Sequence, residues 1–521
     1  MRATDAVFGA SFKSASLDEL TQKLLAQPWD RADGPTVINA MSGKALIAVP
    51  DRESGRRLVQ KATRIVIEEM PGLQFSGFVS EKSFEWSDAE GTLDACSFEV
   101  HRRIGELRAD AHQPIERYRQ WPLADICATS GLPAKAVHTD KGERVRASAL
   151  ALAKHRAIER WSERVKSLGS DKARIVERVA DLEARFDQAR KWAVVHADGN
   201  GLGRIFEGFA DKVKAILPER VSPNAHYART LCEFSIAIDA ATQAAFSAAL
   251  CVFRDAEEGK EPEAEIEGEE QKPGFVPVVP IILGGDDLTA ITDANKALAF
   301  TAEFLRQYED KTRASKIIRA LTDQQGLTAC AGVAIIGRHY PFHHAYELAE
   351  ALIGSAKSIK RHGGGSALDF HVLFDSLTPD LEDSRRCDSG DSTDTRQYRL
   401  TMKPYVVSSL ASSSEDRAWA APRRWDDLDK AAGRLAQAIN QGEISTRALQ
   451  RVREALQRGH AAGESAYGLM RPRQTAFTHW GELLTGCGAE LFVDARTPSG
   501  ECARATRLLD VLEVCAQGWQ L

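Results

Sequence analysis

The sequence predicts an α+β protein, and three observations support that class. Apolar runs rich in Val, Ile and Leu lie on both sides of Gly284-Gly285-Asp286-Asp287, which predicts two strands joined as a β-hairpin over 276–291. A second apolar strand, Ala193–Val195, leads into Asp198 and a glycine-rich turn. Helical segments are expected over 225–249, 295–308 and 345–360, and further strands over 327–336 and 367–373. The resulting order, β-α-β-β-α-β with one added helix and strand, is that of a ferredoxin-like palm domain.

Residues 5–110 show a similar order of their own. We expect strands at 6–12, at two places within 36–49 and at 73–79, with helices at 17–26 and 52–70. The hairpin tip of this segment, Met41–Lys44, contains no Asp or Glu. The segment is therefore predicted to be a degenerate palm without metal ligands, and an unrelated α+β sandwich is the alternative.

The predicted domains follow from these patterns. A charged helical stretch is expected at 144–190, polar loops or linkers at 255–272 and 379–397, a strand at 399–407 and a helical pattern from 424 to the end. The boundaries are 1–110 for the degenerate palm, 111–190 for a connector, 191–375 for the palm with the acidic hairpin, 376–423 for a linker and strand, and 424–521 for a C-terminal helical bundle.

Composition limits the class of protein. The net charge of −6 over 521 residues argues against a non-specific nucleic-acid coat. The nine cysteines are scattered without a C-x-x-C pair, so we expect reduced thiols and no zinc site. We find no signal peptide and no run that approaches 18 apolar residues, which predicts a cytoplasmic protein without membrane partners.

The palm order brings a first-strand acid close to the hairpin acids. Adjacent carboxylates repel each other unless a cation lies between them, and Mg²⁺ or Mn²⁺ prefers such oxygen ligands. Two divalent ions about 3.5–4 Å apart can stabilise both the attacking and the leaving oxygens of nucleotidyl transfer. Asp198, Asp286 and Asp287 are therefore the predicted catalytic residues and metal ligands, with the Gly199 carbonyl as a neutral ligand.

Other residues are predicted to contact the nucleotide. Glycines without a Cβ let the backbone approach a triphosphate, whose oxygens accept main-chain N–H bonds. Two lysines lie off the apolar stripe of the 345–360 helix and could reach a phosphate, although lysines in a last turn often only complement the helix dipole. The predicted nucleotide-binding residues are Gly199, Asn200, Gly201, Gly203, Gly284, Gly285, Lys357 and Lys360.

Together these motifs resemble the GGDD-type CRISPR polymerases, the large subunits of type III CRISPR effector complexes. The Gly284–Asp287 hairpin, His196–Gly203, Ala356-Lys357, Leu400–Tyr405 and Cys127–Ala134 resemble motifs of that family. The resemblance implies two ferredoxin-like palms with nucleotides between them and a C-terminal helical domain. It also implies conversion of ATP into a cyclic oligoadenylate second messenger in antiviral defence.

The chain departs from the family pattern in several places. Asn200 stands where the family often has a second acid, and only Cys127 remains of the zinc-ribbon cysteines. No His-Asp pair opens the chain, so an HD nuclease is not expected. We therefore expect a compact or stand-alone relative. RNA, CRISPR effector subunits and a second copy of the chain are the partners left open.

Two other functions remain as alternatives. Diguanylate cyclases share the palm and a similar hairpin, but Leu288 stands where their motif has Phe. The other alternative is a non-catalytic subunit of a ribonucleoprotein that binds nucleotide or RNA without turnover. Three converging acids argue against it, because their repulsion costs stability without a metal.

Overall fold

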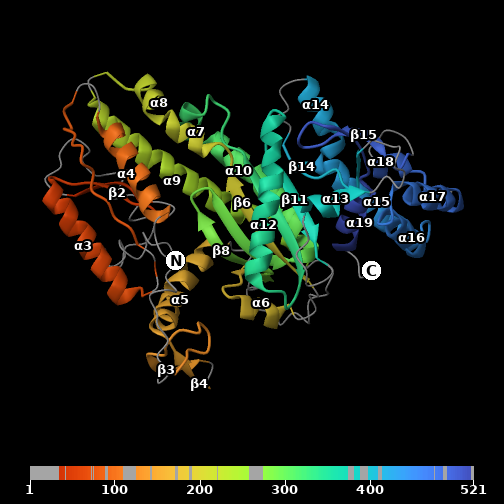
Figure 1. The fold of residues 1–521 in the computed structure, drawn as a ribbon, viewed down its shortest axis with the longest axis horizontal. Helices are drawn as coiled ribbons and strands as arrows, with labels where there is room; N and C mark the ends of the chain where they lie inside the picture. The colour runs from red at the N-terminus through yellow and green to blue at the C-terminus, as the bar shows by residue number, and fades with distance from the viewer. Residues whose placement is uncertain are drawn as a thin grey trace, which may run out of the picture. The chain divides into compact units, whose positions relative to one another are not determined.

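The computed structural model describes residues 35–517 apart from 41–42, 72, 74, 89–91, 110–124, 141–142, 170–173, 187–190, 220, 257–273, 374–380, 388–396, 409–413, 475 and 485–489. The chain divides into two compact units, drawn with their elements in Figure 1. Unit 1 contains Met1–Ser167, Gly201–Ala240 and Arg313–Gln325; unit 2 contains Leu168–Asn200, Ala241–Thr312 and Gly326–Leu521.

A six-stranded mixed sheet forms the centre of unit 2, and it confirms the predicted strands of the acidic palm. Its order is β14-β11-β10-β6-β9-β8. The central strand β6 pairs antiparallel with both β10 and β9, whereas β10 and β11 are parallel. The strands are β6 (Lys191–Gly199), β8 (Val278–Gly284), β9 (Asp287–Asp293), β10 (Ala329–Gly337), β11 (Ala367–Val372) and β14 (Tyr405–Val406).

Both faces of β6 are covered, which explains its unbroken apolar run. Trp192 and Val194 pack on one face against helix α12 (Phe342–Ala356), in a core with Leu348 and Leu352. The alternate residues Ala193, Val195 and Ala197 point to the opposite face and are fully buried as well. In Figure 1, α12 crosses in front of the sheet.

A glycine in β10 lets α12 approach the sheet. A Cβ on Gly332 would lie 2.1 Å from the carbonyl oxygen of Ala349 in α12. No side chain fits such a gap, so the close packing of helix on sheet depends on this glycine. α12 continues as the 3₁₀ turn η3 (Lys357–Arg361).

Unit 1 contains part of the predicted degenerate palm. Strands β1 (Thr36–Asn39) and β2 (Leu46–Ala48) form the expected antiparallel hairpin. Helix α3 (Arg52–Glu69) follows, with Asp51 capping it by accepting a bond from the Ser54 N–H. The strand predicted at 6–12 and the helix at 17–26 lie outside the described residues.

The strand predicted at 73–79 is wrong in the part of this segment that the structure describes. Those residues have no strand pairing, and some of them lie against α3 instead. A Cβ on Gly77 would lie 2.7 Å from Val59, and one on Gly55 would lie 3.0 Å from Val79. Side-chain packing on the helix thus replaces backbone pairing at this place. The described residues therefore show two of the four palm strands.

The helix predicted at 144–190 is also wrong at both ends. Its beginning belongs to the hairpin of β3 (Ala136–Asp140) and β4 (Glu143–Ala147), and helix α5 (Ala149–Leu168) starts only after it. The Ser148 hydroxyl accepts a bond from the Ala151 N–H, which favours a helix start there. A strand, β5 (Arg174–Ile175), and helix α6 (Val179–Arg185) follow.

The C-terminal part combines helices with a small sheet, so a purely helical pattern from 424 onward is wrong. Strands β15 (Val493–Arg496) and β16 (Cys502–Ala505) form a hairpin, in a four-stranded sheet of order β12-β13-β16-β15. The expected strand at 399–407 is divided into β13 (Gln397–Arg399) and β14. The linker predicted at 379–397 contains helix α13 (Leu381–Arg385) and β12 (Arg386–Cys387). The loop predicted at 255–272 lies almost wholly outside the described residues.

The remaining helices complete the two units. They are α4 (Leu93–Ala109), α7 (Leu202–Glu207), α8 (Phe209–Ala215), α9 (Pro223–Ala249) with η2 (Leu250–Ala256), α10 (Ala294–Ala314), α11 (Lys316–Leu321), α14 (Ser414–Ala420) with η4 (Ala421–Arg423), α15 (Trp425–Asn440), α16 (Thr446–Leu456), α17 (His460–Met470) with η5 (Arg471–Gln474), α18 (Trp480–Leu484) and α19 (Leu508–Gln517), beside the short strand β7 (Phe275–Val276). Pro223–Phe253 passes a length and composition test for a membrane span, but half of its most apolar window is buried in the fold, as in an ordinary core helix.

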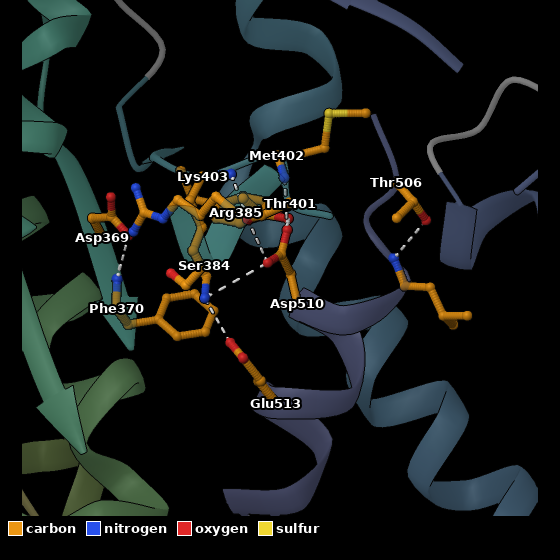
Figure 2. A network of polar contacts seen from close by, with 12 residues as sticks. Asp369, Phe370, Ser384, Arg385, Thr401, Met402, Lys403, Thr506, Asp510 and Glu513 are labelled. Carbon is orange, nitrogen blue, oxygen red and sulfur yellow. Dashed lines mark hydrogen bonds and ion pairs between the residues drawn. The ribbon is translucent and has the colours of Figure 1, made fainter. Parts of the chain in front are cut away.

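A buried polar network ties α19 to the palm sheet (Figure 2). Asp510 of α19 accepts bonds from the Thr401 and Tyr405 hydroxyls at 2.6 and 2.7 Å. The Lys403 ammonium lies 3.6 Å from Asp510 and 3.9 Å from the centre of the Phe370 ring in β11. The Leu400–Tyr405 motif therefore holds the C-terminal part against the edge of the palm.

Candidate metal and nucleotide site

Three carboxylates converge at one end of the central sheet. Asp198 lies near the end of β6, and Asp286 and Asp287 lie at the tip of the β8–β9 hairpin. One carboxylate oxygen from each lies within 4.8 Å of the other two, and all three residues are half-buried. The structure thus brings together the three acids that the sequence singled out. Among the described residues, this is the one group of His, Cys, Asp or Glu side chains close enough to share a metal ion.

The hairpin turn is built by its two glycines. Gly285 has a φ of 64°, and Gly284, which pairs with Asp287, has a φ of 150°. These φ values favour glycine, which has no Cβ. The Thr242 hydroxyl of α9 donates a 2.5 Å bond to the Gly285 carbonyl, which fixes the tip from the helix side. In the structure, both glycines shape the turn that carries the acids.

Gly199 makes room for one of the acids. A Cβ at this position would lie 2.8 Å from both the Cβ and Oδ2 of Asp286. Any other residue would push Asp286 away from Asp198. The glycine that follows the first-strand acid is therefore required by the convergence of the cluster itself.

Asn200 anchors the turn after β6. Its amide nitrogen donates to the Thr328 hydroxyl at 3.1 Å and to the Gly365 carbonyl at 3.0 Å, and it lies 3.3 Å from Cys330 Sγ. Its Oδ1 is buried and has no hydrogen-bond partner among the described residues. Through these bonds, Asn200 links the end of β6 to the segments just before β10 and β11.

The remaining predicted nucleotide ligands differ in where they lie. Lys357 forms an ion pair with Asp198, so it lies at the acidic cluster. Burial lowers the pKa of Lys357, and the nearby charge of Lys360 lowers it further. Lys360 itself is exposed. Gly201, with a φ of 78°, and Gly203 lie at the start of α7 and belong to unit 1, whereas the three acids belong to unit 2.

Two tyrosines near the acids were not predicted from the sequence. Tyr308 of α10 is fully buried, and its pKa is raised well above its usual value by burial and by the charges of Asp286 and Asp287. Tyr346 of α12 has a raised pKa because of burial and of the charges of Glu350 and Asp287. The sequence offers only their helical spacing, which does not reveal that both helices reach the hairpin.

Comparison with known proteins assigns the central domain. Residues 191–363 match the family model of the second palm domain of Cas10/Cmr2. This part of the chain is therefore a palm domain of the Cas10/Cmr2 type. The match agrees, for this domain, with the resemblance that the Gly284–Asp287 motif indicated. No curated protein matched the chain.

Solved structures show weaker likenesses. Csm1 from T. onnurineus is 12% identical, with 62% of this chain and 45% of that chain covered and a TM-score of 0.31. A Csm1-Csm4 cassette in complex with cA4 is 11% identical, with 62% and 45% covered and a TM-score of 0.30. A cassette in complex with one ATP is 12% identical, with 74% and 54% covered and a TM-score of 0.31. The chain thus spans about half the length of these relatives, and the domain assignment rests on the family match.

Proposed function

We propose that this protein is a metal-dependent nucleotidyltransferase that converts ATP into a cyclic oligoadenylate. The observation that carries the proposal is the convergence of Asp198, Asp286 and Asp287 within a Cas10/Cmr2-type palm. A strand-end acid and a hairpin pair are the arrangement in which palm enzymes transfer nucleotides. Among the described residues, no observation specifically favours a diguanylate cyclase or a non-catalytic subunit.

The donor set fits a hard divalent cation. All three side chains offer carboxylate oxygens, and their mutual repulsion at this separation is relieved by a positive charge. Asp198, Asp286 and Asp287 would hold Mg²⁺ or Mn²⁺, with the Gly199 carbonyl as a further oxygen. The ions, when bound, would neutralise charge on the triphosphate and stabilise the negative charge that develops on the ribose oxygen as its proton leaves.

The chain's own residues supply position and charge. Lys357, already at Asp198, offers an ammonium for a phosphate oxygen, and Lys360 extends the positive charge along η3. In the reaction, a ribose hydroxyl of one nucleotide forms a bond to the α-phosphorus of another, and the bond to pyrophosphate breaks. The proton leaves the hydroxyl, and pyrophosphate carries away the electron pair. Ring closure repeats the same step within one oligonucleotide.

The biological setting follows as part of the proposal. The product would act as a second messenger in cytoplasmic antiviral defence. CRISPR effector subunits and RNA are the proposed partners, and a second copy of the chain would serve instead if the protein works alone.

Product analysis tests the proposal. Purified protein is incubated with each NTP and with mixtures, in Mg²⁺ or Mn²⁺, with and without RNA, and products are resolved by chromatography and mass spectrometry. We expect a cyclic adenylate that disappears when EDTA is added. A cyclic product from GTP alone would favour the diguanylate alternative. Tight RNA binding with no product under any condition would favour the non-catalytic one.

A further inference from the structure

The two lysines of the site lie on η3, which is a short turn. Lys357 begins this turn, at Asp198, and Lys360 lies near its end. A 3₁₀ turn has poorer hydrogen-bond geometry than an α-helix, so its position depends on how both of its ends are held. The first end continues α12, which packs on the sheet. What holds the other end therefore matters for where Lys357 lies.

The chain that follows η3 restrains its end only weakly. The N–H of His362 donates to the Ile359 carbonyl at 2.8 Å and closes the turn. Gly363, Gly364 and Gly365 come next, with φ values of 85°, 76° and 109°. Glycine has the widest choice of backbone conformations, so three in succession place little restraint on the residue before them. The end of η3 needs another support.

That support is a stack of two rings. The His362 ring lies on the Trp419 ring of α14, with ring centres 4.1 Å apart and planes inclined by 7°. Trp419 is 4% exposed and belongs to the same core cluster as Ile359 of η3. Burial lowers the pKa of His362, so its ring is uncharged at neutral pH and stacks as a neutral aromatic group. The end of η3 therefore rests on Trp419.

Both rings are fixed by contacts with other elements. The Arg423 guanidinium lies 4.6 Å from the centre of the Trp419 ring, and it donates to the carbonyls of Trp419 at 3.0 Å and Arg496 at 2.6 Å. His362 Nε2 lies 3.3 Å from the carbonyl oxygen of Pro498, in the turn between β15 and β16. The stack therefore joins η3 to α14 and to the β15–β16 hairpin, which are distant from it in the sequence.

We propose that His362 is a positioning residue: its stack on Trp419 holds η3 so that the Lys357 ammonium stays at Asp198, ready for a phosphate of the nucleotide. This role rests on the proposed function and deepens it, because it makes α14 and the β15–β16 hairpin supports of the site. His362 acts through Lys357 and takes no part in the transfer itself. Removing the stack should displace Lys357 while the three acids keep their places.

A zero-length cross-link measures where Lys357 lies, without any need for activity. A water-soluble carbodiimide activates carboxylates and joins them to amines only where the two are in contact, as Lys357 and Asp198 are. Peptide mass spectrometry measures the yield of the resulting amide. The pair of Lys212 and Asp323, whose charged atoms lie 3.7 Å apart in unit 1, is the internal reference.

Three variants are compared with the wild type. His362→Ala removes the ring, whereas His362→Phe keeps a flat ring on Trp419. His460→Ala is the matched control, because His460 of α17 stacks on Tyr398 of β13 in the same manner, with ring centres 3.8 Å apart. Circular dichroism and thermal melting establish that each variant is folded.

We expect His362→Ala to lower the yield of the Lys357–Asp198 cross-link about tenfold, because the loss of an aromatic contact is worth up to that factor in an equilibrium. His362→Phe should retain most of the yield, and His460→Ala should match the wild type. The yield of the Lys212–Asp323 cross-link should be the same in all four proteins.

A double-mutant cycle tests whether His362 acts through Lys357. His362→Ala should lower kcat/KM for ATP about tenfold in the wild-type background. In the Lys357→Met background the same substitution should change kcat/KM little, because the group that the stack positions is already gone. A ring that only stabilises the fold would lower kcat/KM equally in both backgrounds.

Any of three results would overturn the role of His362. They are a folded His362→Ala protein with the wild-type yield of the Lys357–Asp198 cross-link, a loss of yield in His362→Phe or His460→Ala as large as in His362→Ala, and equal losses of kcat/KM in both backgrounds. A wild type that forms the cross-link but makes no product would remove the proposed function alone. The cross-link yields would then still decide whether His362 holds η3.

Discussion

At the scale of single residues, the geometry of the acidic cluster depends on the missing side chain of Gly199. A Cβ there would lie 2.8 Å from Asp286, and neither the backbone nor the β carbon of Asp286 can yield without moving the hairpin. The sequence identified the three acids and the glycine, but it assigned Gly199 to metal and nucleotide binding. Its packing role appears only once the hairpin is placed beside β6.

The substitution Gly199→Ala should therefore lower kcat at least tenfold, because it displaces a carboxylate from the cluster. The displacement should leave the overall fold intact, as followed by circular dichroism. Gly433→Ala is the matched control: a Cβ at Gly433 in α15 meets no atom within 4 Å, and removing a helical glycine stabilises a fold by about 0.5–1 kcal/mol. Equal activity of Gly199→Ala and wild type would contradict this reading of the site.

Substitutions of Lys357 and Lys360 should differ in their effect on activity. Lys357 is ion-paired with Asp198, whereas Lys360 is exposed. We expect Lys357→Met to lower kcat/KM for ATP by a factor of about 10² or more, and Lys360→Met to lower it several-fold less, because charge interactions weaken with exposure. Steady-state kinetics on both variants decides the matter, and a larger loss in Lys360→Met would reverse the assignment.

At the scale of elements, the hairpin is held by a bond from a neighbouring helix. The Thr242 hydroxyl is fully buried and donates to the Gly285 carbonyl at the tip. Strands and helices of this palm could be predicted, because their apolar periodicity is local. The bond between α9 and the turn could not, because it joins residues far apart in the sequence.

Thr242→Val should lower the free energy of unfolding by about 1–3 kcal/mol, since it removes the donor from a buried carbonyl. Urea denaturation measures this loss. Thr301→Val is the comparison: Thr301 is equally buried, but its hydroxyl bonds the Ala297 carbonyl of its own helix, so the loss should be smaller. An equal loss in both variants would show that the bond to the hairpin tip contributes no more to stability than a bond within one helix.

The wrong predictions at this scale share a cause. Residues 73–79 look like a strand but pack on α3 through Gly55 and Gly77. The β15–β16 hairpin was missed because its strands are short and two of its inward positions, Ala503 and Ala505, are small. In both places tertiary packing, which a single sequence does not display, decides between strand and coil.

At the scale of the whole molecule, the C-terminal part is joined to the palm by buried charge. Asp510 is 1% exposed and Lys403 is 4% exposed, and burial raises the pKa of Asp510. Arg385 bonds Asp369 of β11 at 2.8 Å and the Ser355 hydroxyl of α12 at 3.0 Å. The sequence pattern predicted an ordered strand at 399–407, and Leu400–Tyr405 within it resembles a motif of the family, but its partners could not be foreseen.

Lys403→Met should destabilise the fold by about 3–5 kcal/mol, because it leaves Asp510 and Glu513 as buried or half-buried carboxylates without their cation. Thermal unfolding of the wild type and of Lys403→Met measures the effect. Glu68→Gln, which breaks the exposed pair with Arg64, is the control and should leave the stability almost unchanged. A Lys403→Met protein as stable as wild type would show that the network does not support the fold.

In the proposed function, Asp198, Asp286 and Asp287 form one metal-dependent catalytic centre. The most direct measurement is the rate of cyclic adenylate formation from ATP in Mg²⁺ or Mn²⁺ by the wild type and by the double variant Asp286→Ala, Asp287→Ala, with folding checked by circular dichroism and thermal melting. We expect the double variant to be folded and its rate to fall below detection. A folded double variant that makes the product at the wild-type rate would contradict this expectation.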